Sequence, residues 1–193
     1  MKSFFAIFTS LAVIAATPGV SAAALGSVAC ANEVIADTTY IGQDKDVKVT
    51  ASHCGFTPLV NAHGDEVSSL GKRQNAVNVC GAQCNTFCFA PSGGGPNEGD
   101  CAVIATALIF EAQNTGALFN ITAFGTPTNK ITMTYKSCTT YFLNQASTTL
   151  SYCLPDWSTL VTWLASDCNA ANNAHGGLCV AADQSWYIQV QHT

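Results

Sequence analysis

Basic residues are scarce in this chain. Its 193 residues include 7 Lys and Arg against 12 Asp and Glu, which gives a formal net charge of −5. Beyond Arg73 the only cations are Lys130 and Lys136. A protein that holds nucleic acid or an anionic membrane by charge needs a basic patch. The composition therefore argues against nucleic acid as a partner and favours neutral, polar partners such as glycans.

Catalytic motifs are missing as well. The sequence has no G-x-S-x-G elbow, no H-E-x-x-H helix and no phosphate-binding loop. Beyond Arg73 its histidines are His175 and His192, and neither has a carboxylate or nucleophile at a known motif distance. Asp156 fits the start of a helix better than the role of an acid catalyst. We therefore expect no enzyme and no catalytic residues, and we keep a small secreted hydrolase as the weaker alternative.

Long apolar runs are absent outside the N-terminus. There, Lys2 precedes an apolar run over residues 4–16, and Val20-Ser21-Ala22 is a small-x-small cleavage signal. This pattern is typical of a secretory signal peptide, which we place at residues 1–22. The run is too short for a bilayer span, which takes about 20 residues. We predict a secreted, extracellular protein with no stable membrane insertion.

Cysteine, in contrast, is plentiful, and Lys72-Arg73 divides the ten cysteines into two even sets. Ahead of this dibasic pair lie Cys30 and Cys54, which we expect to pair with each other. Behind it lie Cys80, Cys84, Cys88, Cys101, Cys138, Cys153, Cys168 and Cys179. An even count lets each side close its own disulfides in an exported protein, although the sequence does not choose among the pairings.

The dibasic pair predicts proteolytic processing after Arg73. The chain would then comprise a pro-segment at residues 23–73 and a mature disulfide-rich domain at residues 74–193. No Cys pair has a matching His pair at zinc-finger spacing, so we expect no metal and no cofactor.

Apolar residues at helical spacing predict two helices. One begins at Asn97 or Asp100 and runs to about residue 113, and the other begins at residues 154–156. Trp163 lies off the apolar stripe of the second helix. A third helix is favoured over residues 80–88, where cysteine recurs every four residues. An irregular disulfide knot is the alternative for this stretch.

Alternating residues predict three β-hairpins. They join residues 117–124 to 131–136, residues 138–144 to 148–153, and residues 178–181 to 185–191. We therefore predict an α+β fold, an antiparallel sheet with packed helices that is stapled by disulfides. If the helix over residues 80–88 covers the second face of the sheet, the fold is an α/β/α sandwich. Otherwise it is a two-layer α/β sandwich.

The last predicted strand carries a set of side chains that suits a sugar. Sugar sites combine an aromatic face with amides and carboxylates that hold hydroxyl groups. We take as candidate glycan-binding residues Asp183, Trp186, Tyr187, Gln189 and Gln191. Core packing is the alternative for Trp186, and a cross-strand contact is the alternative for Tyr187.

One N-glycosylation sequon, Asn120-Ile121-Thr122, occurs beyond Arg73. It predicts a glycoprotein that carries its sugar on Asn120. Because Asn120 lies on the polar side of its predicted strand, a glycan there would keep that side accessible. An unoccupied sequon is the alternative.

Several motifs resemble those of secreted fungal proteins. Three stretches resemble the killer-toxin-like effector domains. They are Gly99-Asp100-Cys101-Ala102-Val103-Ile104 at a helix start, Tyr135-Lys136-Ser137-Cys138 at a strand end, and Gly176-Gly177-Leu178-Cys179 with Trp186-Tyr187-Ile188-Gln189-Val190. The chain is more similar, over about residues 80–192, to a basidiomycete family of lectin-like glycan-binding proteins, which are small disulfide-rich α/β sandwiches. That resemblance implies binding of an N-acetylated, fucosylated glycan and a homodimer formed through sheet edges.

Together these features predict a secreted, non-enzymatic glycan-binding protein with a role in defence. The first alternative is a killer-toxin-like effector that acts on membranes or protein partners, because the lectin-like domain does not require so long a pro-segment. The second alternative is the small hydrolase.

Overall fold

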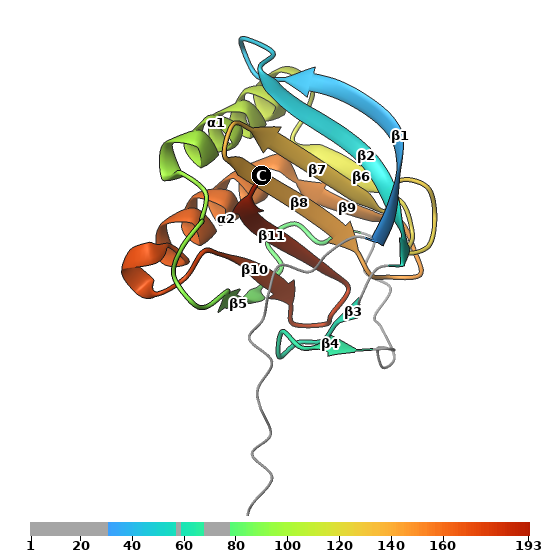
Figure 1. Cartoon of the computed structure of the whole chain (residues 1–193). Coiled ribbons are helices and arrows are strands. Elements are labelled where there is room, and N and C mark those ends of the chain that lie inside the picture. Colours follow the sequence, from blue (N-terminus) through green and yellow to red (C-terminus); the bar gives the residue numbers. More distant parts are fainter. Residues whose placement is uncertain (1–30, 57–58, 68–77) are drawn as a thin grey trace, which may run out of the picture.

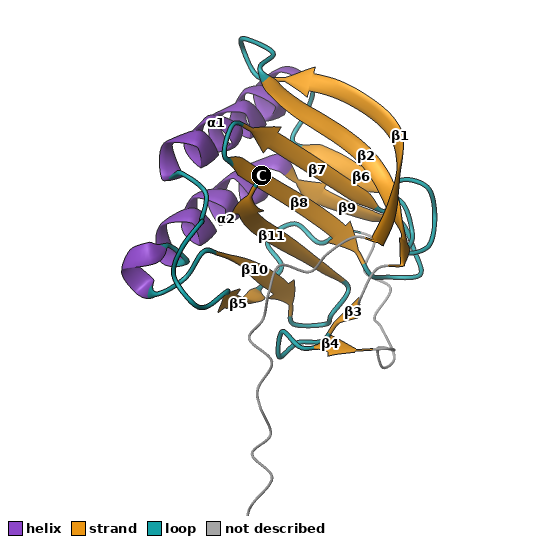
Figure 2. Ribbon diagram, in the orientation of Figure 1, coloured by secondary structure: helices purple, strands orange, loops and turns teal. Residues whose placement is uncertain are grey.

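The computed structural model describes residues 31–56, 59–67 and 78–193. The predicted signal peptide, Cys30 and the Lys72-Arg73 pair lie outside these ranges. The fold is α+β, as predicted: a seven-stranded antiparallel sheet carries two helices on one face (Figures 1 and 2). Neither of the two described helices has the length and apolar character of a membrane span.

The large sheet draws its strands from the whole described chain. In spatial order these are β1 (Ala31–Ile41), β2 (Val47–Phe56), β7 (Lys130–Tyr135), β8 (Cys138–Asn144), β11 (Trp186–His192), β10 (Gly176–Ala181) and β5 (Cys84–Cys88). Two small sheets pair β3 (Leu59–Val60) with β4 (Glu66–Val67), and β6 (Leu118–Ile121) with β9 (Leu150–Cys153).

Both predicted amphipathic helices are present, as α1 (Glu98–Asn114) and α2 (Leu154–Asp167). Asn97 caps α1, because its Oδ1 accepts hydrogen bonds from the backbone N–H groups of Gly99 and Asp100. A short 3-10 turn, η1 (Ala170–Asn172), follows α2. The helices pack on each other and on the sheet around an aromatic core that includes Phe142, Trp157 and Trp186.

The predicted helix over residues 80–88 is wrong, since Cys84–Cys88 is strand β5. Disulfides join Cys84 to Cys179 on β10 and Cys88 to Cys168 at the end of α2. Side chains two residues apart point to one face of a strand, so an extended backbone serves both bonds while β5 pairs with β10. The two-layer alternative is therefore the correct one, and no described helix covers the second face.

Only one of the three predicted hairpins is correct, the pair β10 and β11. The other four strands exist but pair differently: β7 pairs with β8, and β6 pairs with β9. Two residues, Lys136 and Ser137, connect β7 to β8, and Lys136 has the positive φ of 45° that a tight turn requires. Alternation located the strands, but it carries no information on which strand is the neighbour.

All eight cysteines beyond Arg73 pair with one another. The bonds are Cys80–Cys153, Cys84–Cys179, Cys88–Cys168 and Cys101–Cys138. Cys54 is disulfide-bonded too, and Cys30, its predicted partner, lies outside the described residues. The predicted disulfide-rich character is confirmed.

Residues 31–56 and 59–67, which we call the N-terminal segment, are part of this fold. Strand β2 pairs with β7 over five residues, and Val47 lies in the main core with no exposed surface. Val60 joins a second apolar cluster, on the sheet face opposite the helices. Its other buried members are Phe89, Tyr141, Leu143, Leu178, Val180 and Tyr187.

Candidate functional site: a groove between β5 and α2

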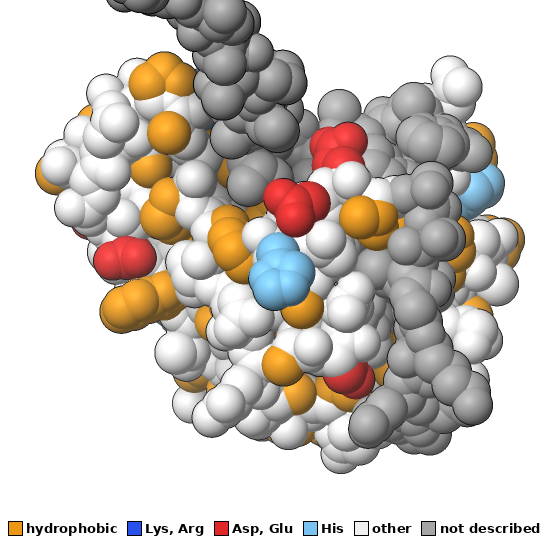
Figure 3. Space-filling model, turned by 90° about the horizontal axis from the view of Figure 1, so that it is seen from below, with side chains coloured by type: hydrophobic (Ala, Val, Ile, Leu, Met, Phe, Trp, Pro, Cys, Tyr) orange, Lys and Arg blue, Asp and Glu red, His pale blue; other side chains and the backbone are white. Residues whose placement is uncertain are grey.

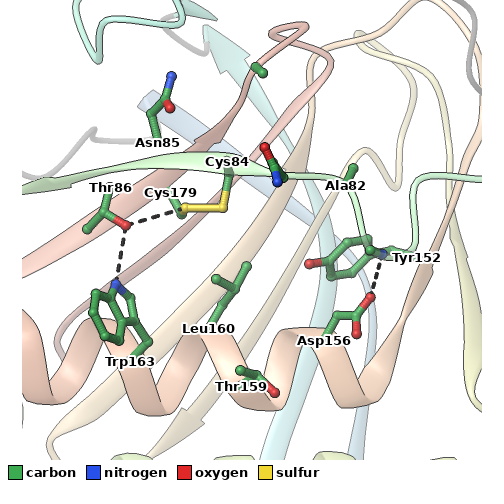
Figure 4. Close-up of a pocket in the computed structure, with 13 residues that line it drawn as sticks. Ala82, Cys84, Asn85, Thr86, Tyr152, Asp156, Thr159, Leu160, Trp163 and Cys179 are labelled. Atoms are coloured by element: carbon green, nitrogen blue, oxygen red, sulfur yellow. Dashed lines mark hydrogen bonds between the residues drawn. A yellow bond between two sulfur atoms is a disulfide. The ribbon is translucent and has the colours of Figure 1, made fainter.

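A groove of about 610 Å³ runs between the edge strand β5 and helix α2 (Figure 4). In the described part of the chain, β5 is the last strand of the large sheet and pairs only with β10. The Cys88–Cys168 disulfide fixes β5 to the C-terminal end of α2. The groove is therefore built on two regular elements joined by a covalent bond, which favours a preformed site.

Trp163 is the most distinctive side chain of the groove. Half of its surface is exposed (50%), which agrees with its position off the apolar stripe of α2. Its indole Nε1–H donates a hydrogen bond of 3.3 Å to Thr86 Oγ1 on β5, across the groove. This bond holds the edge of the ring and leaves an aromatic face open to a ligand.

The wall beside Trp163 is apolar. Leu160 extends from α2 toward the Cys84–Cys179 disulfide (Figure 4). Thr86 Oγ1 lies 3.6 Å from Cys179 Sγ, so the hydroxyl, the disulfide and the indole are close neighbours. This end of the groove therefore presents an aromatic ring beside an apolar wall.

Polar groups gather at the other end of the groove. Asp156, in the first turn of α2, accepts a hydrogen bond of 2.7 Å from the Gly81 N–H through Oδ2. Its negative charge is favourable at a helix N-terminus. Burial, and then the charge of Asp156, raise the pKa of Tyr152, so the Tyr152 hydroxyl stays protonated and can donate a hydrogen bond. Gln83 and Thr159 add uncharged polar atoms to the lining.

The groove combines an aromatic ring and an apolar wall with a few polar groups. Among the described residues that line the groove, Asp156 is the sole carboxylate and none is a histidine. The sulfur atoms closest to Asp156 belong to the Cys80–Cys153 disulfide, so they are not thiolate ligands for a metal.

The five residues predicted to bind glycan do not form an open site in this structure. Tyr187 and Gln189 lie on the second sheet face but have no exposed surface. The Tyr141 hydroxyl donates a hydrogen bond of 2.7 Å to Gln189 Oε1, and Gln189 Nε2 donates to Gln191 Oε1. Half-buried Gln191 is thus engaged within the same strand.

The other two members of that set have structural roles. Trp186 packs in the main core, stacked on Phe142, as its core-packing alternative anticipated. Asp183 lies in the turn between β10 and β11, where it accepts hydrogen bonds from the backbone and hydroxyl of Ser185. The structure therefore does not bring either side chain together with Gln189.

The remaining predicted positions are separate from the groove. Asn120 is exposed on β6, where its Oδ1 accepts a hydrogen bond from the Ser151 hydroxyl, so the sequon is accessible. His175 Nδ1 donates a hydrogen bond of 2.6 Å to the Pro91 carbonyl oxygen. His192 lies at the end of β11. Neither histidine lines the groove.

Sequence reasoning missed the groove residues, although one signal was present. Trp163 was visible as a large aromatic outside the apolar stripe of its helix, which marks an exposed ring. The contribution of Thr86 depended on residues 84–88 being a strand and could not be anticipated from a helical assignment.

No protein-family model matches the chain, and no curated protein matches its sequence.

Proposed function

We propose that this is a secreted, non-enzymatic glycan-binding protein and that the groove between β5 and α2 holds the sugar. The observation that carries the proposal is the half-exposed indole of Trp163, fixed by Thr86 above an apolar wall. An aromatic face of this kind packs against the C–H side of a pyranose. Gln83, Thr159 and Asp156 supply the donors and acceptors that hydroxyl groups need.

The surface charge supports a neutral ligand. Figure 3 shows a face on which the described side chains are mostly uncharged, with a few acidic groups and histidine and no basic side chain in view. Lys130, one of the two cations beyond Arg73, is buried. Such a surface has little attraction for anionic partners. The four described disulfides are typical of exported proteins.

A second candidate function is capture of an extended peptide. Its support is the outer edge of β5, which pairs with no other strand in the described part of the chain. An exposed edge can accept a peptide by strand addition. This reading matches an effector that acts on protein partners.

The test is a glycan array probed with the secreted full-length protein, followed by titration of the best glycan. We expect Trp163→Ala to weaken binding at least about tenfold, because truncation of an aromatic anchor removes a central contact. The matched control is Ile109→Ala, an exposed apolar residue of α1, which should bind like the wild type.

Failure of the wild type to select any glycan would sink this proposal. Unchanged affinity of the Trp163→Ala variant would remove the groove as the site. A peptide ligand that binds in the presence of excess sugar would instead support the second candidate.

A further inference from the structure

The N-terminal segment contributes to both apolar clusters of the molecule. Figure 1 shows β1 and β2 continuing the large sheet beside β7. Val47 is enclosed in the cluster beneath the helices, and Val60 is enclosed in the cluster on the other face. Burial of a valine side chain typically stabilises a fold by roughly 1.5–3 kcal/mol. The segment therefore contacts the rest of the sheet in two places, at the edge of β7 and on the face opposite the helices.

Charge gives a second reason for the segment to stay. Lys130 on β7 is only 7% exposed, and its Nζ lies 3.1 Å from Glu33 Oε1 on β1. The ammonium also lies 4.6 Å from the centre of the Tyr141 ring. No other ion pair is found among the described residues. Departure of the segment would remove the carboxylate that pairs with Lys130, and this pair contributes modestly because Glu33 is partly exposed.

The third contact mimics a strand pair. Gln145 is fully buried, and its side-chain amide bonds to both backbone groups of Val60. The Val60 N–H donates to Gln145 Oε1 at 2.6 Å, and Gln145 Nε2 donates to the Val60 carbonyl oxygen at 2.9 Å. Removal of Val60 would leave Gln145 Oε1 without its donor, which typically costs about 1–3 kcal/mol for a buried group, whereas Nε2 would keep its hydrogen bond of 3.1 Å to the Gln184 carbonyl oxygen.

No covalent bond supports these contacts across the predicted cut. The eight cysteines beyond Arg73 are all paired with one another, so Cys54 is bonded to none of them. Among the described residues no disulfide joins the two sides, so the peptide backbone is their covalent connection. A cut after Arg73 would thus convert one chain into two.

We propose that the N-terminal segment is a retained subunit: after cleavage at Lys72-Arg73 it stays paired with β7 and on the second sheet face, and the mature protein consists of two noncovalently associated chains. The partner that fits the β7 edge and the face around Tyr187 is therefore this segment of the same chain. Val60 of the segment would stay packed in the cluster that contains Tyr187 after processing.

The test uses the full-length secreted protein, cut in the folded state by a protease specific for dibasic pairs. A variant with the recognition sequence of another specific protease at residues 68–73 provides the cut if the natural pair resists. After incubation, size-exclusion chromatography separates any released fragment, and intact mass without reductant identifies each species. The uncut protein is the control.

We expect both fragments in one native peak at the elution volume of the uncut protein. In denaturant without reductant they should separate as two masses. Elution of the N-terminal fragment by itself under native conditions would overturn the proposal, because the segment would then be a leader that departs. Fragments that stay joined in denaturant until reduction would overturn it as well. Neither readout contains a glycan, so the outcome is independent of the proposed function.

Discussion

At the scale of single residues, the largely buried Lys130 forms an ion pair with Glu33 of the N-terminal segment. Lys130 is a cation on an interior strand, and the acid that neutralises it lies 97 residues earlier in the chain. Ser52 donates a second hydrogen bond, of 2.6 Å, to the same carboxylate oxygen. Because the Glu33 side chain is 35% exposed, the pair is a modest source of net stability. The main role of Glu33 is therefore to neutralise the charge of the largely buried Lys130.

This pair predicts a pH dependence. Burial by itself would raise the pKa of Glu33, but the Ser52 hydrogen bond and the Lys130 charge lower it below its ordinary value of 4.5. A carboxyl whose pKa is lowered by folding stabilises the fold above its unfolded pKa and loses that contribution as pH falls through the lowered value. The contribution is modest, below about 1 kcal/mol, because Glu33 is partly exposed.

Thermal unfolding of Glu33→Gln and of the wild type, followed from about pH 7 to pH 3, measures this effect. The wild type should be the more stable protein above about pH 4.5, and the difference should shrink toward the acid end. Asp37→Asn, at an exposed position of the same strand, is the matched control. A difference that grows on acidification would contradict the assigned role of the carboxylate.

At the scale of elements, the sequence was informative where structure depends on neighbouring residues. Asn97 and the apolar stripe through Leu108 define α1 locally, and Pro155 with Asp156 defines the start of α2. Strand partners depend on contacts between distant residues, so the pairing of β2 with β7 was not visible. Cysteine spacing at residues 80–88 was equally compatible with a helix and a strand until the bonding partners were known.

The same limit applied to the candidate site. Exposure of Trp163 followed from helical periodicity, a local property, whereas Thr86 and the Cys84–Cys179 wall required the fold. Tyr187 and Gln189 were correctly placed on one strand face, but the sequence did not show that this face would be buried.

The turn between β3 and β4 supports a prediction about β5, the strand that forms the groove. Gly64 in this turn has φ +83°, and a Cβ there would lie 2.7 Å from Phe87 on β5. Gly125 has a similar φ of +79°, but a Cβ there would have no neighbour within 4 Å. Both alanine variants share the backbone strain, and only Gly64→Ala adds the steric conflict with an aromatic ring.

We therefore expect Gly64→Ala to unfold at lower denaturant concentration than Gly125→Ala, with an additional loss of about 1–3 kcal/mol. Glycan affinity of the two variants, measured by titration where both are folded, reports whether the displaced Phe87 disturbs the groove. Equal stability of the two variants would show that a methyl group at residue 64 has no steric conflict with Phe87.

At the scale of the whole molecule, folding joins two parts that the dibasic pair separates in sequence. The main core contains Val47 from one side of the pair and Leu108 from the other, and the second cluster joins Val60 to Leu178 in the same way. Two clusters that share one sheet should unfold together, because loss of the N-terminal segment damages both. The uncut chain should accordingly behave as one cooperative unit.

Cleavage should change unfolding from a unimolecular reaction into one that releases two chains. The uncut chain unfolds to one molecule, so its melting temperature is independent of protein concentration. The cut protein unfolds to two chains, so mass action stabilises it as concentration rises, by about 1.4 kcal/mol for each tenfold increase. For a protein of this size that corresponds to a rise in melting temperature of about 3–6 °C. Differential scanning calorimetry over a hundredfold range would measure it, with the uncut protein as control. A concentration-independent transition in the cut protein would mean that residues 31–67 do not contribute to the cooperative fold.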